Sequence, residues 1–241
     1  MADTTTYCRM LGHVLTIAMH VGNIVYMNRG FSPEVLQDPQ LKAFGKLQPR
    51  YFTVWTFVLQ IINACTGLVC DYLVISNSEN KLYKLPKHLR GFKNTLFSAI
   101  LWPSTWVVCS IFWGLYLYDR SLIFPEFIDK ALTTTSNHIM HTAIIFVVLW
   151  EVYFTPRVEP RSHRRNILHI LTHLLLYLAV LFYTHMQHGV WLYPIFSLVY
   201  GTIYFPLINI AIGVIALTFY YLQWTIINYL WSDSAKTKKI T

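Results

Sequence analysis

Six long apolar stretches dominate this sequence of 241 residues and restrict the folds that it can adopt. Each is long enough to cross the roughly 30 Å hydrocarbon core of a bilayer as a helix, which takes about 20 residues. The stretches are Cys8–Val25, Phe52–Ile75, Leu96–Tyr118, His138–Phe154, Ile167–His185 and Phe196–Trp224. Because lipid offers the backbone no hydrogen-bond partner, we expect each stretch to be an α-helix. The sequence therefore predicts an all-α polytopic membrane protein, a bundle of six transmembrane helices.

The composition agrees with a membrane protein. Hydrophobic residues make up 55% of the chain and charged residues 12%, about half the charged share of an ordinary soluble domain. No loop is long enough to hold another folded unit, so residues 1–241 are expected to form a single six-helix transmembrane domain. The first stretch lacks a small-residue cleavage site, which favours a retained anchor over a removed signal peptide.

The lysine and arginine residues are distributed unevenly between the two sides of the predicted bundle. Of the 19, 13 fall on the side that holds both termini, and the net charge is +8. The positive-inside bias therefore predicts that both termini are cytosolic. The basic loops are explained as topology signals and contacts for anionic membrane lipids, so no nucleic acid partner is expected.

The C-terminal residues match a dilysine retrieval signal. Lys238 and Lys239 occupy the fourth and third positions from the end. Terminal addresses of this kind are read by a receptor and do not anchor the chain. We expect coat-protein recognition of the two lysines and residence in the endoplasmic reticulum membrane, with other endomembranes or the plasma membrane as alternatives.

Polar residues recur on one face of several predicted helices, at spacings of three and four. In the second span they are Thr53, Thr56, Gln60, Asn63, Gly67 and Cys70, and in the first they are Arg9, His13, Thr16, His20 and Asn23. Because polar side chains are costly in lipid, these faces should point into the bundle. Most of these residues would then be interhelical hydrogen-bond partners. Pro103 and Pro206 fall inside the third and sixth spans, where we expect kinks.

Topology places several reactive side chains at one depth. The second and fourth spans both begin on the non-cytosolic side, which holds Thr53 and His141 together with His138, His185 and Asp119. A hydroxyl and an imidazole are the minimum for nucleophilic acyl transfer, because the histidine takes the proton from the hydroxyl. Residue type and depth alone leave many such pairs open.

The chain resembles the androgen-induced gene 1 family. The matching stretches are YFTVWTFVLQ at 51–60, FWGLYLYDRSLIFPEFID at 112–129, NHIMHT at 137–142, HGVWLYP at 188–194 and INYLWSD at 227–233. This family is known as multi-pass membrane hydrolases that cleave fatty acid esters of hydroxy fatty acids with a threonine nucleophile and a histidine. The resemblance implies that Thr53, in Y-F-T, is the nucleophile and that His141, in N-H-x-M-H, is the base.

The remainder of such a site is left open by the resemblance. Thr56 and His138 lie one helical turn from the proposed pair and are expected to support it. An oxyanion stabiliser is required, for which Asn137, His138 and His185 are the candidates. Asp119 and Asp129, on the same side as His141, are candidate acidic partners for the histidine. Alternatively, Asn137 and His138 only cap the fourth span.

The implied substrate is a branched lipid ester that enters from the bilayer. Its acyl chains are expected beside Ile144, Ile145 and Val148, and neither a metal nor another cofactor is expected.

Two other functions stay open. The ten histidines include the pairs 138/141, 169/173 and 185/188, which could serve a metal-dependent membrane lipid hydrolase. The absence of adjacent histidines, and the division of the pairs between the two membrane faces, count against this. The polar faces could also belong to a transporter or a non-catalytic membrane scaffold, although no inverted repeat is visible.

Overall fold

The computed structural model describes residues 4–80 and 82–237, and within these residues every regular element is helical. The helices are α1 (Thr4–Gly30), α2 (Pro39–Leu47), α3 (Phe52–Ser76), α4 (Lys87–Thr95), α5 (Trp102–Asp119), α6 (Thr134–His138), α7 (Ile144–Phe154), α8 (Arg164–His188), α9 (Pro194–Val199) and α10 (Tyr204–Thr237). Two π-helical segments, η3 (Leu96–Leu101) and η6 (Ile139–Ala143), join α4 to α5 and α6 to α7. The 3₁₀ turns are η1 (Val35–Gln37), η2 (Gln48–Arg50), η4 (Arg120–Leu122) and η5 (Glu126–Lys130).

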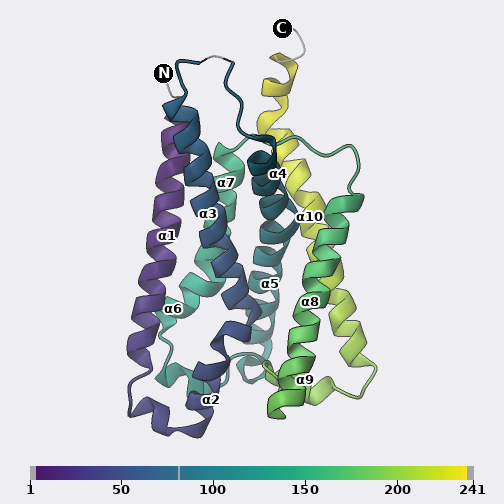
Figure 1. Cartoon of the computed structure of the whole chain (residues 1–241). Coiled ribbons are helices and arrows are strands. Elements are labelled where there is room, and N and C mark those ends of the chain that lie inside the picture. Colours follow the sequence, from purple (N-terminus) through teal and green to yellow (C-terminus); the bar gives the residue numbers. More distant parts are fainter. Residues whose placement is uncertain (1–3, 81, 238–241) are drawn as a thin grey trace.

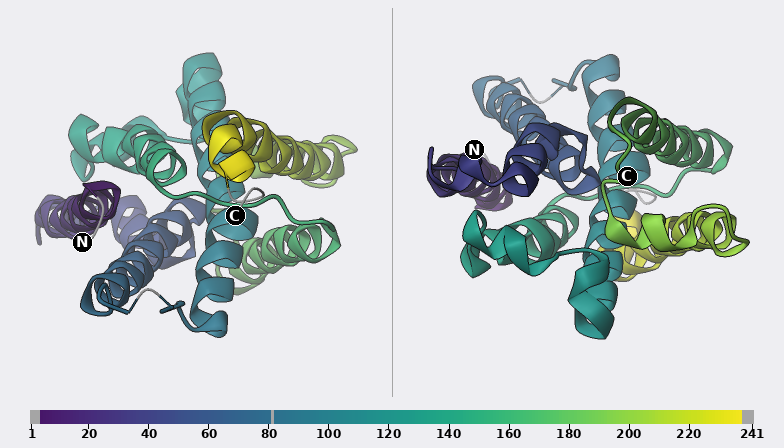
Figure 2. Two further views of the ribbon diagram at one scale, coloured as in Figure 1. Left: turned by 90° about the horizontal axis from the view of Figure 1, so that it is seen from above. Right: turned by 90° about the horizontal axis from the view of Figure 1, so that it is seen from below.

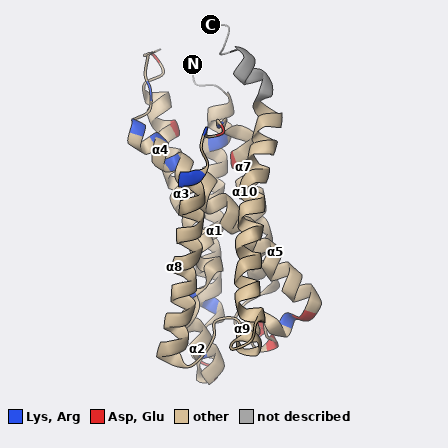
Figure 3. Ribbon diagram, turned by 90° about the vertical axis from the view of Figure 1, so that its right-hand side faces the viewer, with Lys and Arg blue, Asp and Glu red and all other residues tan. Residues whose placement is uncertain are grey.

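Six helical units are long and apolar enough to cross a membrane, which confirms the predicted all-α membrane fold. They comprise residues 4–30, 52–76, 87–122, 134–154, 164–188 and 204–231. Helix α1 begins and α10 ends at the same end of the bundle (Figure 1), and the charged residues lie mostly towards the two ends (Figure 3). The cytosolic location of the termini and the single-domain organisation stay predictions. Lys238 and Lys239 lie outside the described residues.

The third span, made of α4, η3 and α5, is the centre of the bundle. It is the most buried of the six, with 67% of its apolar window buried against 17–39% for the others. Viewed along the bundle, it runs between α1, α3 and α7 on one side and α8 and α10 on the other (Figure 2). Trp102 at the start of α5 is fully buried, and its indole N–H donates to the carbonyl oxygen of Phe219 in α10 at 2.8 Å.

The polar faces of α1 and α3 meet inside the bundle, as their periodicity predicts. A ring nitrogen of His20 lies 2.7 Å from Oε1 of Gln60, and Nε2 of Gln60 donates to the carbonyl oxygen of Ile144 at 2.9 Å. All three residues are buried. These contacts join three spans through paired polar groups, which is the structural role expected of most such residues.

The structure corrects the beginning of the sixth span. We expected one helix from Phe196, but α9 ends at Val199 and α10 begins at Tyr204. Gly201 between them has φ +82°, a left-handed conformation that ends helices and that glycine adopts without strain. Pro206 consequently lies in the first turn of α10, where its missing N–H removes no helical hydrogen bond. Pro103 is the second residue of α5, and the π-helical η3 ends two residues before it, so the irregularity lies just before the proline.

Candidate active site

Thr53 lies in the first turn of α3. Tyr51 is the N-cap, with φ −74° and ψ 138°, and its side chain makes no capping hydrogen bond. Thr53 is the second residue of the helix and is half-buried. The first N–H groups of a helix have no acceptor within it, and the N–H groups of Thr53 and Val54 have no backbone acceptor in the described part of the chain.

Thr53 and His141 are in hydrogen-bond contact. Oγ1 of Thr53 lies 3.3 Å from Nε2 of His141. The other ring nitrogen, Nδ1, lies 3.0 Å from the carbonyl oxygen of Asn137 and 2.8 Å from its Oδ1. A carbonyl oxygen only accepts hydrogen bonds, so Nδ1 carries the proton and Nε2 is free to accept. The hydroxyl of Thr53 therefore donates to His141, the arrangement that a general base needs.

The His141 ring is held from two directions. It stacks on Phe112 of α5 with ring centroids 3.5 Å apart and planes 8° from parallel, and only 5% of the residue is exposed. It also lies in the π-helical η6, and such turns are rare and recur at functional sites. Packing and hydrogen bonding together fix the orientation of the imidazole.

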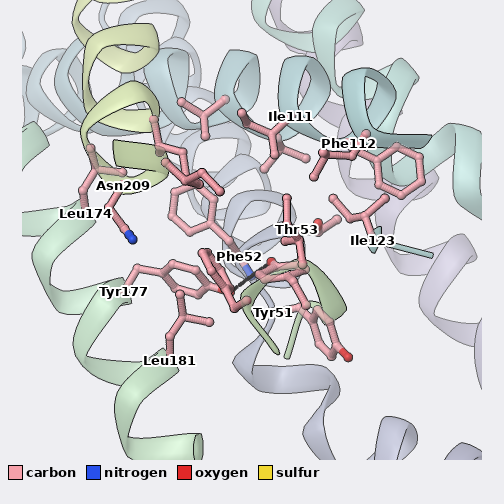
Figure 4. A pocket seen from close by; sticks show the side chains of 18 of the residues that line it. Tyr51, Phe52, Thr53, Ile111, Phe112, Ile123, Leu174, Tyr177, Leu181 and Asn209 are labelled. Atoms are coloured by element: carbon pink, nitrogen blue, oxygen red, sulfur yellow. Dashed lines mark hydrogen bonds between the residues drawn. The ribbon is translucent and has the colours of Figure 1, made fainter. Parts of the chain in front are cut away.

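Thr53 and His141 line a cavity of about 680 Å³, within the size range of ligand sites. Figure 4 shows Thr53 at its wall, opposite Leu174, Tyr177 and Leu181 of α8. The lining is mostly apolar and draws on both apolar clusters of the bundle. One cluster includes Phe44, Phe124, Ile128 and Leu132, and the other includes Val107, Val108, Leu181 and Phe196. The cavity thus offers apolar surface on more than one side of the polar pair.

The cavity opens sideways between α8 and α10. Four of its lining residues are also exposed on the outer surface of the bundle: Leu171 (41%), Leu175 (63%), Ile210 (62%) and Val214 (56%). They belong to spans that face hydrocarbon, so this opening leads to the bilayer.

Of the other predicted site residues, the structure brings Asn137 to the pair but gives Thr56 and His138 different surroundings. The hydroxyl of Thr56 donates to the carbonyl oxygen of Phe52 at 2.9 Å, within its own helix. Nδ1 of His138 lies 3.2 Å from Oγ1 of Thr142, and its ring stacks on Trp113. Neither residue lines the cavity.

His185 and Asp119 also lie apart from the cavity lining. His185 stacks on Trp191 with ring centroids 4.3 Å apart. The carboxylate of Asp119 accepts hydrogen bonds from the N–H and hydroxyl of Ser121 at the start of η4.

The expected position of the acyl chains needs a correction. Ile144 and Val148 are almost completely buried in the apolar core, and neither they nor Ile145 line the cavity. The apolar lining near the pair comes instead from α2, α5, α8 and α10, because α7 turns the side chains of Ile144 and Val148 into the bundle.

Tyr177 and Tyr193 are cavity residues that the site prediction did not include. Tyr177 shares one face of the fifth span with His173 and Thr184, at spacings of four and seven, but Tyr193, in the W-L-Y-P run, looks like an ordinary aromatic residue at a membrane interface. The three histidine pairs form no joint metal site, since no three His, Cys, Asp or Glu side chains in the described part of the chain are arranged to hold an ion.

The fold and the cavity together define a class: multi-pass membrane proteins with a hydroxyl–imidazole pair facing an apolar cavity that opens to lipid. A family model described as FAR-17a/AIG1-like protein matches residues 9–228, so the chain belongs to that family, as its motifs predict.

Several curated relatives support this assignment. The chain is 27% identical over 230 residues to the androgen-dependent TFPI-regulating protein of Homo sapiens, covering 94% of this chain and 95% of that protein. It is 30% identical over 161 residues to the Mesocricetus auratus protein of the same name, covering 66% and 68%. It is 26% identical over 145 residues to the androgen-induced gene 1 protein of Homo sapiens, covering 58% and 60%. No solved structure matches significantly.

Proposed function

We propose that the protein is an intramembrane lipid ester hydrolase with Thr53 as nucleophile and His141 as general base. The observation that carries this proposal is the 3.3 Å contact between Oγ1 of Thr53 and Nε2 of His141 at the wall of the apolar cavity. A threonine hydroxyl is a weak nucleophile until a base takes its proton, and this imidazole has its free nitrogen directed at the hydroxyl.

The reaction proceeds through an acyl-enzyme. His141 takes the proton of Thr53, whose oxygen attacks the ester carbonyl, and the protonated imidazole then gives that proton to the departing alcohol oxygen. A water molecule, deprotonated in turn by His141, attacks the acyl group on Thr53. Ester and water are thereby converted into a hydroxy fatty acid and a fatty acid, and the Thr53 hydroxyl is restored.

Asn137 orients the base in this scheme. Its two oxygens both accept from Nδ1–H of His141, which fixes the tautomer and stabilises the imidazolium that forms during the attack. Asn137 is neutral, so its contribution is positioning and hydrogen bonding without an added charge.

The cavity favours an ester with apolar chains on both sides of the carbonyl. Fatty acid esters of hydroxy fatty acids have this form, and the opening between α8 and α10 gives such a lipid a route from the bilayer. We place the activity in the endoplasmic reticulum membrane, with both termini cytosolic, on the basis of the dilysine end and the distribution of basic residues.

The test compares hydrolysis of branched and simple lipid esters by the wild type, Thr53→Val and Thr66→Val in matched membranes. Both substitutions keep the side-chain shape within α3, but the Thr66 hydroxyl donates to the carbonyl oxygen of Ile62 and lies outside the cavity lining. Thr53→Val should abolish turnover and Thr66→Val should retain it. Full activity in a folded Thr53→Val protein would refute the proposal.

A further inference from the structure

Two tyrosine hydroxyls meet the first N–H of α3, one residue before Thr53. The N–H of Phe52 lies 3.0 Å from Oη of Tyr177 and 3.1 Å from Oη of Tyr193. The hydroxyl of Tyr177 donates to Oη of Tyr193 at 3.0 Å. Figure 4 shows Tyr177 reaching from α8 towards Phe52 at the cavity wall.

One donor of this group has no partner within it. The N–H of Phe52 and the two hydroxyl protons are three donors, the acceptors within the group are the two tyrosine oxygens, and two hydroxyls cannot donate to each other at once. With Tyr177 donating to Tyr193, the hydroxyl proton of Tyr193 has no acceptor among the described residues. Buried donors are nearly always paired, so an uncommitted proton beside a cavity points to an acceptor on a ligand.

Backbone N–H groups next to Phe52 are further donors without an acceptor among the described residues. The N–H groups of Thr53 and Val54 also have no acceptor in the described part of the chain, and both residues line the cavity. They lie at the positive end of a 25-residue helix, where negative charge is stabilised. Burial raises the pKa of Tyr193, so its hydroxyl stays protonated at neutral pH.

The three residues that the sequence suggests as oxyanion donors are not available at the cavity. Asn137 is bonded to His141, while His138 and His185 do not line the cavity.

We propose that the hydroxyl of Tyr193, positioned by Tyr177, donates to the carbonyl oxygen of the ester as it becomes an oxyanion, together with the N–H groups of Thr53 and Val54. This inference rests on the proposed hydrolase function and assigns the remaining catalytic group. The charge that forms on the carbonyl oxygen when Thr53 attacks meets donors that are already in place, which is how oxyanion sites lower a barrier.

Either tyrosine hydroxyl can donate to the carbonyl oxygen when the other is removed, which gives the proposal a distinctive kinetic signature. In Tyr193→Phe the Tyr177 proton loses its acceptor and becomes available, and in Tyr177→Phe the Tyr193 proton stays available. Each single variant should therefore lower kcat only about threefold to tenfold, whereas the double variant should lower it about 10²–10³-fold, the range for loss of an oxyanion donor. The KM should change little, because the donor acts on the developing charge.

The experiment measures kcat and KM on a two-chain lipid ester for the full-length protein in lipid vesicles. It compares the wild type, both single variants, the double variant and Tyr183→Phe, an α8 tyrosine that is 59% exposed and outside the cavity lining. A double variant with a much lower kcat at unchanged KM, beside an active Tyr183→Phe, supports the proposal. A folded double variant with wild-type kcat, beside an inactive Thr53→Val, overturns it while sparing the proposed function.

Two further outcomes are informative. An active Thr53→Val overturns the proposed function and this inference together. Should the double variant not fold, the single variants decide, and wild-type kcat in both overturns the inference.

Discussion

Two buried polar regions lie in this bundle, and they are built on different principles. One is the proposed catalytic group of Thr53, His141 and Asn137 at the cavity. The other, the ionic cluster, consists of Arg9, His13, Asp71, Lys93, Glu151 and Arg157, all of which except the partly exposed Arg9 are buried. It joins α1, α3, α4 and α7 towards the end of the bundle where α1 begins (Figure 1).

The ionic cluster is held by ion pairs and has no contact with the cavity. Arg9 lies 2.6 Å from Asp71, Arg157 lies 2.6 Å from Glu151, and Lys93 lies 3.6 Å from Glu151. Burial lowers the pKa of Arg157, and the neighbouring Glu151 opposes that shift. None of these residues lines the cavity.

The catalytic group, by contrast, is neutral, and Thr53 and His141 face the cavity. Burial of polar residues in this bundle therefore identifies packing elements as readily as reactive ones, and access to a cavity is what separates the two.

Two buried histidines give the sharpest test of this distinction. His141→Ala should lower turnover by about 10³-fold or more, because general bases contribute about 10²–10⁴ and the nucleophile depends on this one. His20→Ala should keep turnover near wild type and lower the free energy of unfolding by about 1–3 kcal/mol, since Oε1 of Gln60 loses its buried partner. Ester hydrolysis and thermal unfolding of both variants check this, and equal losses of activity would remove the distinction.

Glu151→Ala, in contrast to His141→Ala, should lower the stability of the protein and leave its turnover unchanged. It leaves Arg157 and Lys93 buried without their carboxylate, a change that costs about 3–5 kcal/mol in comparable cases. Unfolding in detergent would report the loss, and the specific activity of the remaining folded protein should match the wild type. A stability equal to wild type would contradict the view that the cluster is a packing element.

Asn137→Ala refines the account of the catalytic group itself. The carbonyl oxygen of residue 137 still accepts from Nδ1–H of His141, so only one of two hydrogen bonds is lost, worth about 1–1.5 kcal/mol. This corresponds to roughly a tenfold lower kcat. A loss as large as that of His141→Ala would show that the backbone contact does not hold the imidazole.

Gly213→Phe tests the open side of the catalytic group. A Cβ added at this cavity-lining position meets no atom within 4 Å, so we expect the ring to enter the cavity and to slow long-chain branched esters several-fold more than short esters. Gly114→Phe is the matched control, because a Cβ at this position also meets no atom within 4 Å but the position lies outside the cavity lining. Equal chain-length profiles for the two variants would argue against lipid binding there.

The smallest effect is expected at Asp119, where Asp119→Asn should leave kcat unchanged. Its carboxylate bonds to Ser121 and does not line the cavity. A tenfold or larger fall in kcat would return Asp119 to the site as an acidic partner of His141.

The sequence predicts the features that depend on periodicity and composition. Apolar length identifies the six spans, and spacings of three and four identify the faces on which His20 and Gln60 meet. Helix direction explains why Thr53 and His141, 88 residues apart, lie at one depth.

Features that depend on tertiary packing could not be predicted in this way. The bond between Tyr177 and Tyr193 needs the exact approach of a loop to two helices. The π-helical turn at His141 and the break at Gly201 also have no distinct periodicity.

The most direct test of the central claim is to locate the covalent adduct that a lipid-like fluorophosphonate forms while it inhibits ester hydrolysis. Mass spectrometry of the wild-type protein should find the phosphonyl group on Thr53, protected by an excess of branched ester and absent from His141→Ala. Complete inhibition with the phosphonyl group on a different residue would contradict the account.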